Sequence, residues 1–241
     1  MCTASWLSAG GDFFLLFNRD ERRTRAKGLP PQRSVAGDTR YLAPLDPESG
    51  GTWIAVNERG LVLALLNRSE DGHAPQAGTM SRGTVIPALI GNRDPEVAIQ
   101  RLQELDLKEC GPFRLLAQRG DEQVLVASWN GSQLASQGLK TAAGLLCSSS
   151  LGDERVTRAR TSTWRRLRSS APHWTVDELR ALHRSHDPEP SADSVCMHRD
   201  DAETVSQVEI HVSGAAIELA FRDGPPCRGG AVAIDRLSRA D

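Results

Sequence analysis

Short β-rich runs that come in pairs around tight turns are the feature that most constrains the fold of this chain. Residues 3–8 and 12–17 flank Gly10-Gly11, and residues 52–57 and 61–66 flank a second short turn. Such spacing is typical of β-hairpins. Because parallel strands need a much longer crossover between them, the sequence predicts mainly antiparallel sheets.

The remaining pattern adds further strands and three helices. Other β-rich runs are expected at 113–118, 123–129, 143–148, 194–198, 205–212, 215–222 and 230–234. Helices are expected at 94–105, 154–168 and 175–186, where apolar residues, caps or a capping box recur at helical spacing. The polar stretches 22–50 and 68–80 are expected to be loops. Helices that come in separate blocks among antiparallel strands favour an α+β fold.

Composition narrows the class of protein. A chain of 241 residues forms one large domain or two small ones, and its net charge of −2 argues against a dedicated nucleic-acid binder. No run of about 18 apolar residues predicts a membrane span, and the N-terminal apolar segment lacks the basic start of a signal peptide. The five cysteines are irregularly spaced, which favours a reducing cytoplasm over a disulfide framework.

Cys2 directly follows Met1. Aminopeptidases remove Met1 when the second residue is small, and removal would leave a thiol and a free α-amine on one residue. An α-amine has a pKa near ~8, so part of it is unprotonated at neutral pH and can act as a general base. From its position alone, an inert cysteine is the commoner outcome.

Four polar residues, 18–21, follow the first hairpin. They could simply turn the strand into solvent. If the hairpin pairs in register, however, the end of its second strand returns to Cys2. Arg19 would then favour the thiolate, and Asp20 would hold the α-ammonium by a charge-assisted hydrogen bond.

Three further motifs admit two interpretations each. Asn67 ends a strand and is either a turn residue or a donor to an oxyanion. The run 50–53, which ends at Trp53, lets the backbone approach a ligand or forms a turn. Arg82, between Ser81 and Gly83, helps to bind a substrate or belongs to a helix cap.

Other candidate features are weaker. The arginines of 154–168 favour a solvated helix face over an anion site. Cys196 and His198 have ligand chemistry, but one Cys-x-His without a second pair favours a buried strand over a metal or haem ligand set. The serines at 148–150 lack the Gly-x-Ser-x-Gly pattern of a serine hydrolase. No metal site and no cofactor are therefore predicted.

Taken together, these motifs resemble the NRDE family, also called the transport and Golgi organisation family. The resemblance rests on the runs 1–3, 18–21, 50–53, 66–68 and 81–83, with the region 148–150. The family is similar to N-terminal nucleophile hydrolases of the bile salt hydrolase and penicillin V acylase type. The resemblance implies a single domain over residues 1–241 with a four-layer αββα fold.

The same resemblance implies roles for individual residues. Cys2 is expected to be the nucleophile, Asp20 the partner of the α-amine and Asn67 the oxyanion donor. The acylases have an arginine where this chain has Phe17, and Arg19 is expected to replace it. Substrate contacts are expected from Asn18, Trp53, Arg68, Arg82, Ser149 and His198.

The leading hypothesis is an N-terminal cysteine amidohydrolase or acyltransferase that cleaves a linear C–N amide through a thioester. The alternative is a non-catalytic carrier of haem or of a lipid or coenzyme A-related ligand in the same cleft, because members of the family have been linked to those ligands. Either function implies a small-molecule partner and no nucleic acid. The sequence leaves the substrate, the removal of Met1 and a homo-oligomeric state open.

Overall fold

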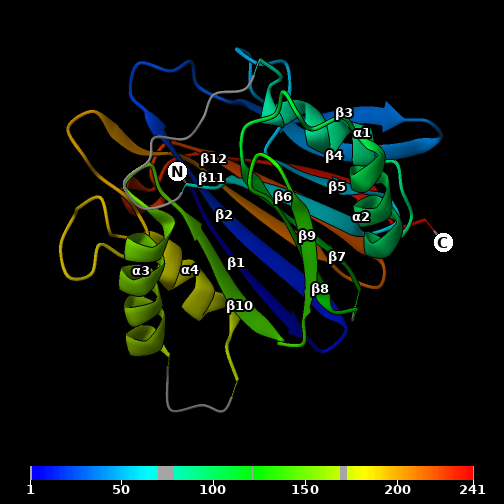
Figure 1. The fold of residues 1–241 in the computed structure, drawn as a ribbon. Helices are drawn as coiled ribbons and strands as arrows, with labels where there is room; N and C mark the ends of the chain where they lie inside the picture. The colour runs from blue at the N-terminus through cyan, green and yellow to red at the C-terminus, as the bar shows by residue number, and fades with distance from the viewer. Residues whose placement is uncertain (1, 70–78, 121, 169–172, 241) are drawn as a thin grey trace.

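The computed structural model describes residues 2–69, 79–120, 122–168 and 173–240. Two antiparallel sheets are stacked on one another, and helices cover their outer faces (Figure 1). The first sheet has the strand order β10-β1-β2-β11-β12-β13, with bounds β1 (Cys2–Ala9), β2 (Asp12–Arg22), β10 (Ala143–Ser148), β11 (Ala202–Val212), β12 (Ala216–Asp223) and β13 (Val232–Ser238).

The second sheet contains the strands in chain order from β3 to β9. Their bounds are β3 (Leu29–Ala36), β4 (Thr39–Leu45), β5 (Ile54–Asn57), β6 (Leu61–Asn67), β7 (Phe113–Arg119), β8 (Val124–Trp129) and β9 (Leu134–Leu139). The α-helices are α1 (Val85–Leu89), α2 (Pro95–Glu104), α3 (Asp153–Leu167) and α4 (Val176–Arg184), and the short 3₁₀ helices are η1 (Arg82–Thr84) and η2 (Pro226–Arg228).

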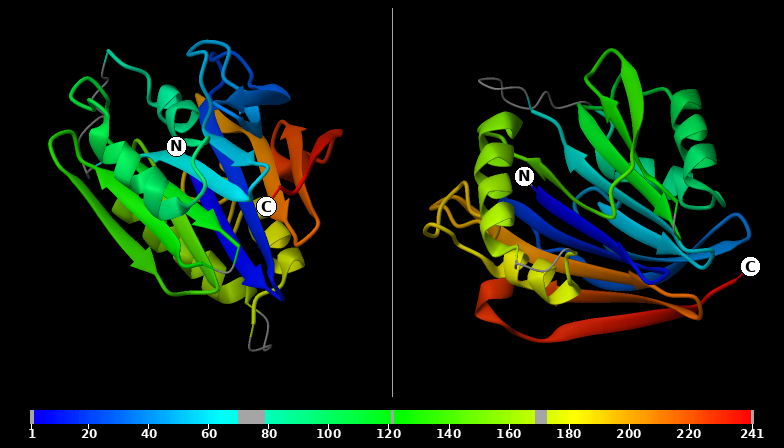
Figure 2. Two further views of the ribbon diagram at one scale, coloured as in Figure 1. Left: turned by 90° about the vertical axis from the view of Figure 1, so that its right-hand side faces the viewer. Right: turned by 90° about the horizontal axis from the view of Figure 1, so that it is seen from below.

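Three apolar cores separate four layers. The central core lies between the sheets and contains Trp6, Phe13 and Phe17 from the first sheet. A second core packs α1 and α2 on β5–β8, and a third packs Trp174 and Leu179 of the α4 region on β1 and β2. Figure 2 shows the two helical pairs on opposite sides of the stacked sheets. The predicted α+β, four-layer αββα architecture is therefore confirmed.

Strand alternation assigns the residues of β1 to two faces. Cys2, Ala4 and Trp6 belong to the central core, whereas the side chains of Thr3 and Ser5 contact residues of α3 and α4. Successive side chains of a strand point to opposite faces, so this pattern is the expected one. The strand therefore presents Cys2 between the sheets, at the beginning of a central strand.

Most of the predicted elements are present. Both N-terminal hairpins form, with Cys2 opposite Arg19 in the first of them. The predicted helices correspond to α2, α3 and α4, and α4 begins with the capping box between Thr175 and Glu178. The polar loop predicted at 68–80 lies largely outside the described residues. Among the described residues no helix combines the length and the apolar character that a membrane span requires.

Two secondary-structure predictions were wrong, and one strand was not predicted. Residues 22–50 contain the hairpin of β3 and β4, although β3 includes Pro30 and Pro31. Because β3 is an edge strand, its prolines need not donate to a ladder and its side chains remain largely exposed. The run 194–198 is not a strand. An isolated bridge joins His198 to Glu203, and the backbone of Met197 bonds Thr204. The edge strand β9 was not predicted.

A buried histidine joins α4 to the first sheet. His183 Nε2 lies 2.8 Å from Ser5 Oγ, and its Nδ1 lies 2.9 Å from Asn18 Oδ1. Burial, assisted by the nearby Arg160 charge, lowers the pKa of His183 to about 3. The folded protein therefore keeps this imidazole neutral throughout the mildly acidic range.

This neutral histidine predicts a pH dependence of stability. The unfolded chain binds a proton at His183 below pH ~6.5, whereas the folded chain does not until about pH 3. Stability should therefore fall with falling pH across this window, by about 1.4 kcal/mol per pH unit from this group. Urea denaturation between pH 4 and pH 6 should show a shallower pH dependence for His183→Gln. The exposed His173→Gln should match the wild type, and equal slopes for both variants would contradict the assignment.

Candidate active site

A cavity of about 240 Å³ opens at the end of the sandwich where β1 begins. Six of the predicted site residues line it, namely Cys2, Arg19, Asp20, Trp53, Asn67 and Arg82. These residues come from both sheets, from the segment that precedes β5 and from η1, so the fold brings together motifs that are up to 80 positions apart in the sequence. Glu21, Arg25, Asp46 and Met80 are among the other lining residues.

Cys2 lies on a central strand between β10 and β2. Its direct neighbours across the strands are Ser148 and Arg19. Burial is the main influence on the thiol and raises the pKa of Cys2, and the Asp20 carboxylate acts in the same direction. The Arg19 guanidinium and the backbone N–H of Asp20 oppose that increase. The surroundings of the sulfur thus combine a desolvating core with groups that stabilise a thiolate.

Arg19 points into the cavity and is held on two sides. Its Nη2 donates to Asp46 Oδ2 at 3.0 Å, and its guanidinium carbon lies 4.5 Å from the centre of the Trp53 ring. The same carboxylate accepts from Arg25 at 2.8 Å. Arg19 Nη1 is buried and has no hydrogen-bond partner among the described residues. A buried donor without an acceptor is costly, so this nitrogen is suited to an acceptor atom of a ligand.

The Asp20 carboxylate finds hydrogen-bond partners on the face of the first sheet that α3 and α4 cover. Its Oδ1 accepts from Thr204 Oγ1 at 2.7 Å, and its Oδ2 accepts from Arg160 Nη2 at 3.2 Å. Both charged side chains of that ion pair are fully buried. Arg160 also donates to the Cys2 carbonyl oxygen at 3.4 Å and to Thr3 Oγ1. The pair therefore joins α3 to the start of β1, directly behind the sulfur.

Arg160 was missed by the sequence analysis, which assigned the arginines of this helix to a solvated face. The missed signal is its spacing. Val156, Arg160 and Thr163 are all buried on α3 and follow one another at helical intervals of four and three residues. An arginine in the buried register of an otherwise polar helix indicates a partner in the core.

Two glycine motifs form one wall of the cavity by docking onto each other. Thr52 N donates to Gly83 O at 3.0 Å, and a Cβ added at Gly51 would collide with that carbonyl group. Gly51 is therefore needed for the approach of two backbone segments. This contact positions Trp53 and Arg82 on the same cavity.

Asn67 and Arg82 supply further donors. The Asn67 side-chain amide has no hydrogen-bond partner within the described part of the chain, and it lines the cavity from the end of β6. Arg82 Nη1 donates to the carbonyl of Pro112 at 3.2 Å, but no carboxylate of the described residues pairs with it. Burial lowers the pKa of Arg82. An anionic ligand group would compensate this half-buried cation.

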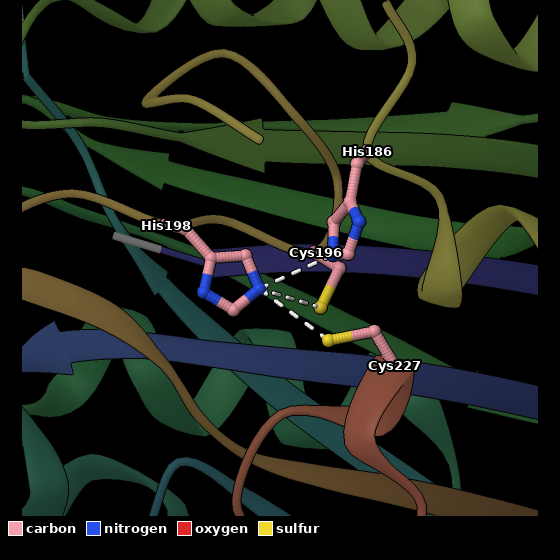
Figure 3. A group of neighbouring side chains, drawn as sticks. All are labelled: His186, Cys196, His198 and Cys227. Atoms are coloured by element: carbon pink, nitrogen blue, oxygen red, sulfur yellow. Dashed lines mark hydrogen bonds between the residues drawn. The ribbon is translucent and has the colours of Figure 1, made fainter. Parts of the chain in front are cut away.

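The other four predicted contact residues lie outside the cavity. Asn18 points toward α4 and donates to the carbonyl of His183 at 2.8 Å. Arg68 donates to Ser128 Oγ at 3.1 Å, and the backbone N–H of Ser149 donates to Asp153 Oδ1 at 2.8 Å. His198 lies in a separate cluster (Figure 3). Their assignment to substrate binding stays a prediction.

The buried ion pair predicts an asymmetric response to mutation. In Arg160→Leu the Asp20 carboxylate would remain buried without its cation, which should cost about 3–5 kcal/mol of the free energy of unfolding. Arg158→Leu is the matched control on the same helix, because Arg158 is exposed and, among the residues that the structure describes, pairs with Glu154. That control should change stability by less than about 0.5 kcal/mol. Urea denaturation measures both, and similar small losses would contradict the role of Arg160.

Comparison with solved structures finds similar folds at low sequence identity. Penicillin V acylase from Agrobacterium tumefaciens is 9% identical with a TM-score of 0.59, and the match covers 99% of this chain and 86% of that chain. An N-acylethanolamine-hydrolyzing acid amidase orthologue from Caenorhabditis elegans is 10% identical with a TM-score of 0.55, over 87% and 92% of the two chains. The C2A mutant of conjugated bile acid hydrolase from Clostridium perfringens is 12% identical with a TM-score of 0.50, over 98% and 97%. The architecture is that of the N-terminal nucleophile hydrolases.

Comparison with curated protein sequences found no match. The family model described as "Transport and Golgi organisation 2" matches residues 1–216. This match confirms the family resemblance seen in the sequence motifs, while the label NRDE remains a description of residues 18–21. The chain therefore belongs to the Transport and Golgi organisation 2 family.

Proposed function

We propose that this protein is an N-terminal cysteine amidohydrolase that cleaves a linear C–N amide through a thioester. The observation that carries the proposal is the convergence of Cys2, Arg19 and Asn67 on one cavity at the start of a central strand. The fold supports it, because the similar solved structures are named as an acylase, a hydrolase and an acid amidase. The nucleophile would require removal of Met1.

In the proposed reaction, the α-amine of Cys2 takes the thiol proton and the sulfur attacks the amide carbonyl carbon. The amide of Asn67 donates to the developing oxyanion, a contribution of about 3 kcal/mol where such donors have been removed from enzymes. The proton passes from the amine to the leaving nitrogen as the C–N bond breaks. Water then attacks the thioester, which releases the acid and restores the thiol.

The walls of the cavity indicate the class of substrate. Arg82 has no carboxylate partner among the described residues, and Arg19 Nη1 is an unused buried donor. Trp53, Leu65 and Met80 add apolar surface beside these cations. We therefore propose an acyl amide that carries a carboxylate or phosphate near the scissile bond, with the anion directed at Arg82.

Two measurements test the proposal. Intact mass of the purified chain should show the loss of Met1, since the mechanism needs a free amine on Cys2. Incubation with a library of anionic N-acyl amides should leave an acyl adduct on Cys2 that denaturation traps. Cys2→Ala should fold with unchanged secondary structure and lose turnover, because neither the nucleophile nor the thioester can form.

Cys110→Ser is the matched control, because Cys110 is also a buried free cysteine and does not line the cavity. It should retain activity. Turnover by Cys2→Ala would exclude the mechanism. Retained Met1, together with haem or acyl-coenzyme A binding that survives Cys2→Ala, would instead favour a non-catalytic ligand carrier.

A further inference from the structure

A second group of reactive side chains lies apart from the residues that line the cavity. His186, Cys196, His198 and Cys227 bring their ligand atoms within 4.8 Å of one another. His186, Cys196 and His198 come from the loop between α4 and β11, and Cys227 comes from η2 (Figure 3). The sequence showed only the Cys-x-His pair, and the fold supplies the second pair.

The contacts converge on one nitrogen. His198 Nε2 lies 3.2 Å from His186 Nε2, 3.4 Å from Cys227 Sγ and 3.7 Å from Cys196 Sγ. A neutral imidazole nitrogen has either one hydrogen or one lone pair, so it cannot form three hydrogen bonds at once. Hydrogen bonding alone therefore does not account for this packing.

The three separations from His198 Nε2 fit a metal ion at the centre of the cluster. Zinc binds histidine nitrogen at about 2.0–2.1 Å and cysteine sulfur at about 2.3 Å in a tetrahedron, which places ligand nitrogens ~3.3 Å apart and nitrogen and sulfur ~3.5 Å apart. The observed separations of 3.2, 3.4 and 3.7 Å match those values. We propose that these four residues form a structural zinc site of the Cys₂His₂ type.

The surroundings suit such a site. Because His198 directs Nε2 at the cluster, its Nδ1 faces the Glu203 carboxylate at 3.7 Å, the arrangement by which carboxylates orient zinc-bound histidines. Both cysteines are free thiols in the structure. On binding, each thiol releases its proton to solvent, and two thiolates then neutralise the dication. Cys196 is fully buried, whereas the other three ligands are only partly covered, which leaves an entry path.

Four protein ligands leave no open position, so the ion would brace the fold and would not bind substrate. The braced segment is the loop between α4 and β11, which contains no helix or strand. That loop supplies carbonyl groups of Ala192 and Asp193 to Arg160. Met197 lies between the ligands Cys196 and His198 in the sequence. Its carbonyl oxygen accepts from Thr204 N, and its backbone N–H donates to Thr204 Oγ1. Thr204 Oγ1 in turn donates to Asp20 Oδ1. The ion would therefore stabilise the loop that supports the Asp20 carboxylate.

The test begins with the wild-type full chain, purified under reducing conditions without chelator. After zinc addition and gel filtration, elemental analysis should give about one zinc per chain. Cobalt(II) should bind with the intense visible bands of a tetrahedral site and with sulfur-to-cobalt charge transfer. Zinc should also raise Tm by roughly 5–10 °C at a free concentration about 100-fold above its Kd.

Cys227→Ser is the main variant, because Cys227 is only partly buried and the fold should tolerate the change. It should lose the zinc and the cobalt spectrum, as should Cys196→Ser. Cys110→Ser, at a buried thiol outside the cluster, should keep both. Absence of zinc and of a tetrahedral cobalt spectrum in the wild type would overturn the proposal. So would unchanged metal content in Cys227→Ser, or a Cys196–Cys227 disulfide that persists under reductant.

Discussion

The buried ion pair between Arg160 and Asp20 is the interaction on which the rest of the site depends. Both side chains are withdrawn from water, so each requires the other to offset its desolvation. The pair also fixes the position of α3 against the first sheet, because Arg160 reaches Thr3 and the Cys2 carbonyl from the same guanidinium. The Arg160 side chain, from a helix more than 150 residues away in the sequence, therefore both holds the start of β1 in place and supplies a positive charge there.

Strand alternation divides the polar motif at 18–21 between two tasks. Arg19 shares the cavity with its cross-strand partner Cys2, whereas Asn18 and Asp20 are bound by groups on the helical side. One strand end thus supplies both the charge beside the sulfur and the buried contacts behind it. This division follows from the two-residue period of a strand. Arg19 faces the cavity, and Asn18 and Asp20 hold the helices against the sheet.

The sequence was sufficient to predict those parts of the fold in which buried positions form a regular pattern of apolar residues. The hairpin of β1 and β2 and the approach of Arg19 to Cys2 were predicted because apolar runs flank a short turn. Edge strands such as β3 and β9 were not, since their exposed side chains carry no alternation that distinguishes them from a loop. Helical spacing marks Arg160 as a buried position, but its partner Asp20 and the partners of His198 lie on distant segments, which no local pattern records.

Thr204 connects the cavity to the cluster of His186, Cys196, His198 and Cys227. Thr204 Oγ1 accepts from Met197 N and donates to Asp20, so it lies between a loop without regular structure and a fully buried carboxylate. A loop of that kind has few ladder hydrogen bonds to hold it, and its ordering entropy must be offset by specific contacts. Crosslinking His186, Cys196, His198 and Cys227 through one ion would restrict it at both ends. The chemistry proposed for Cys2 would then depend on a site that never contacts the substrate.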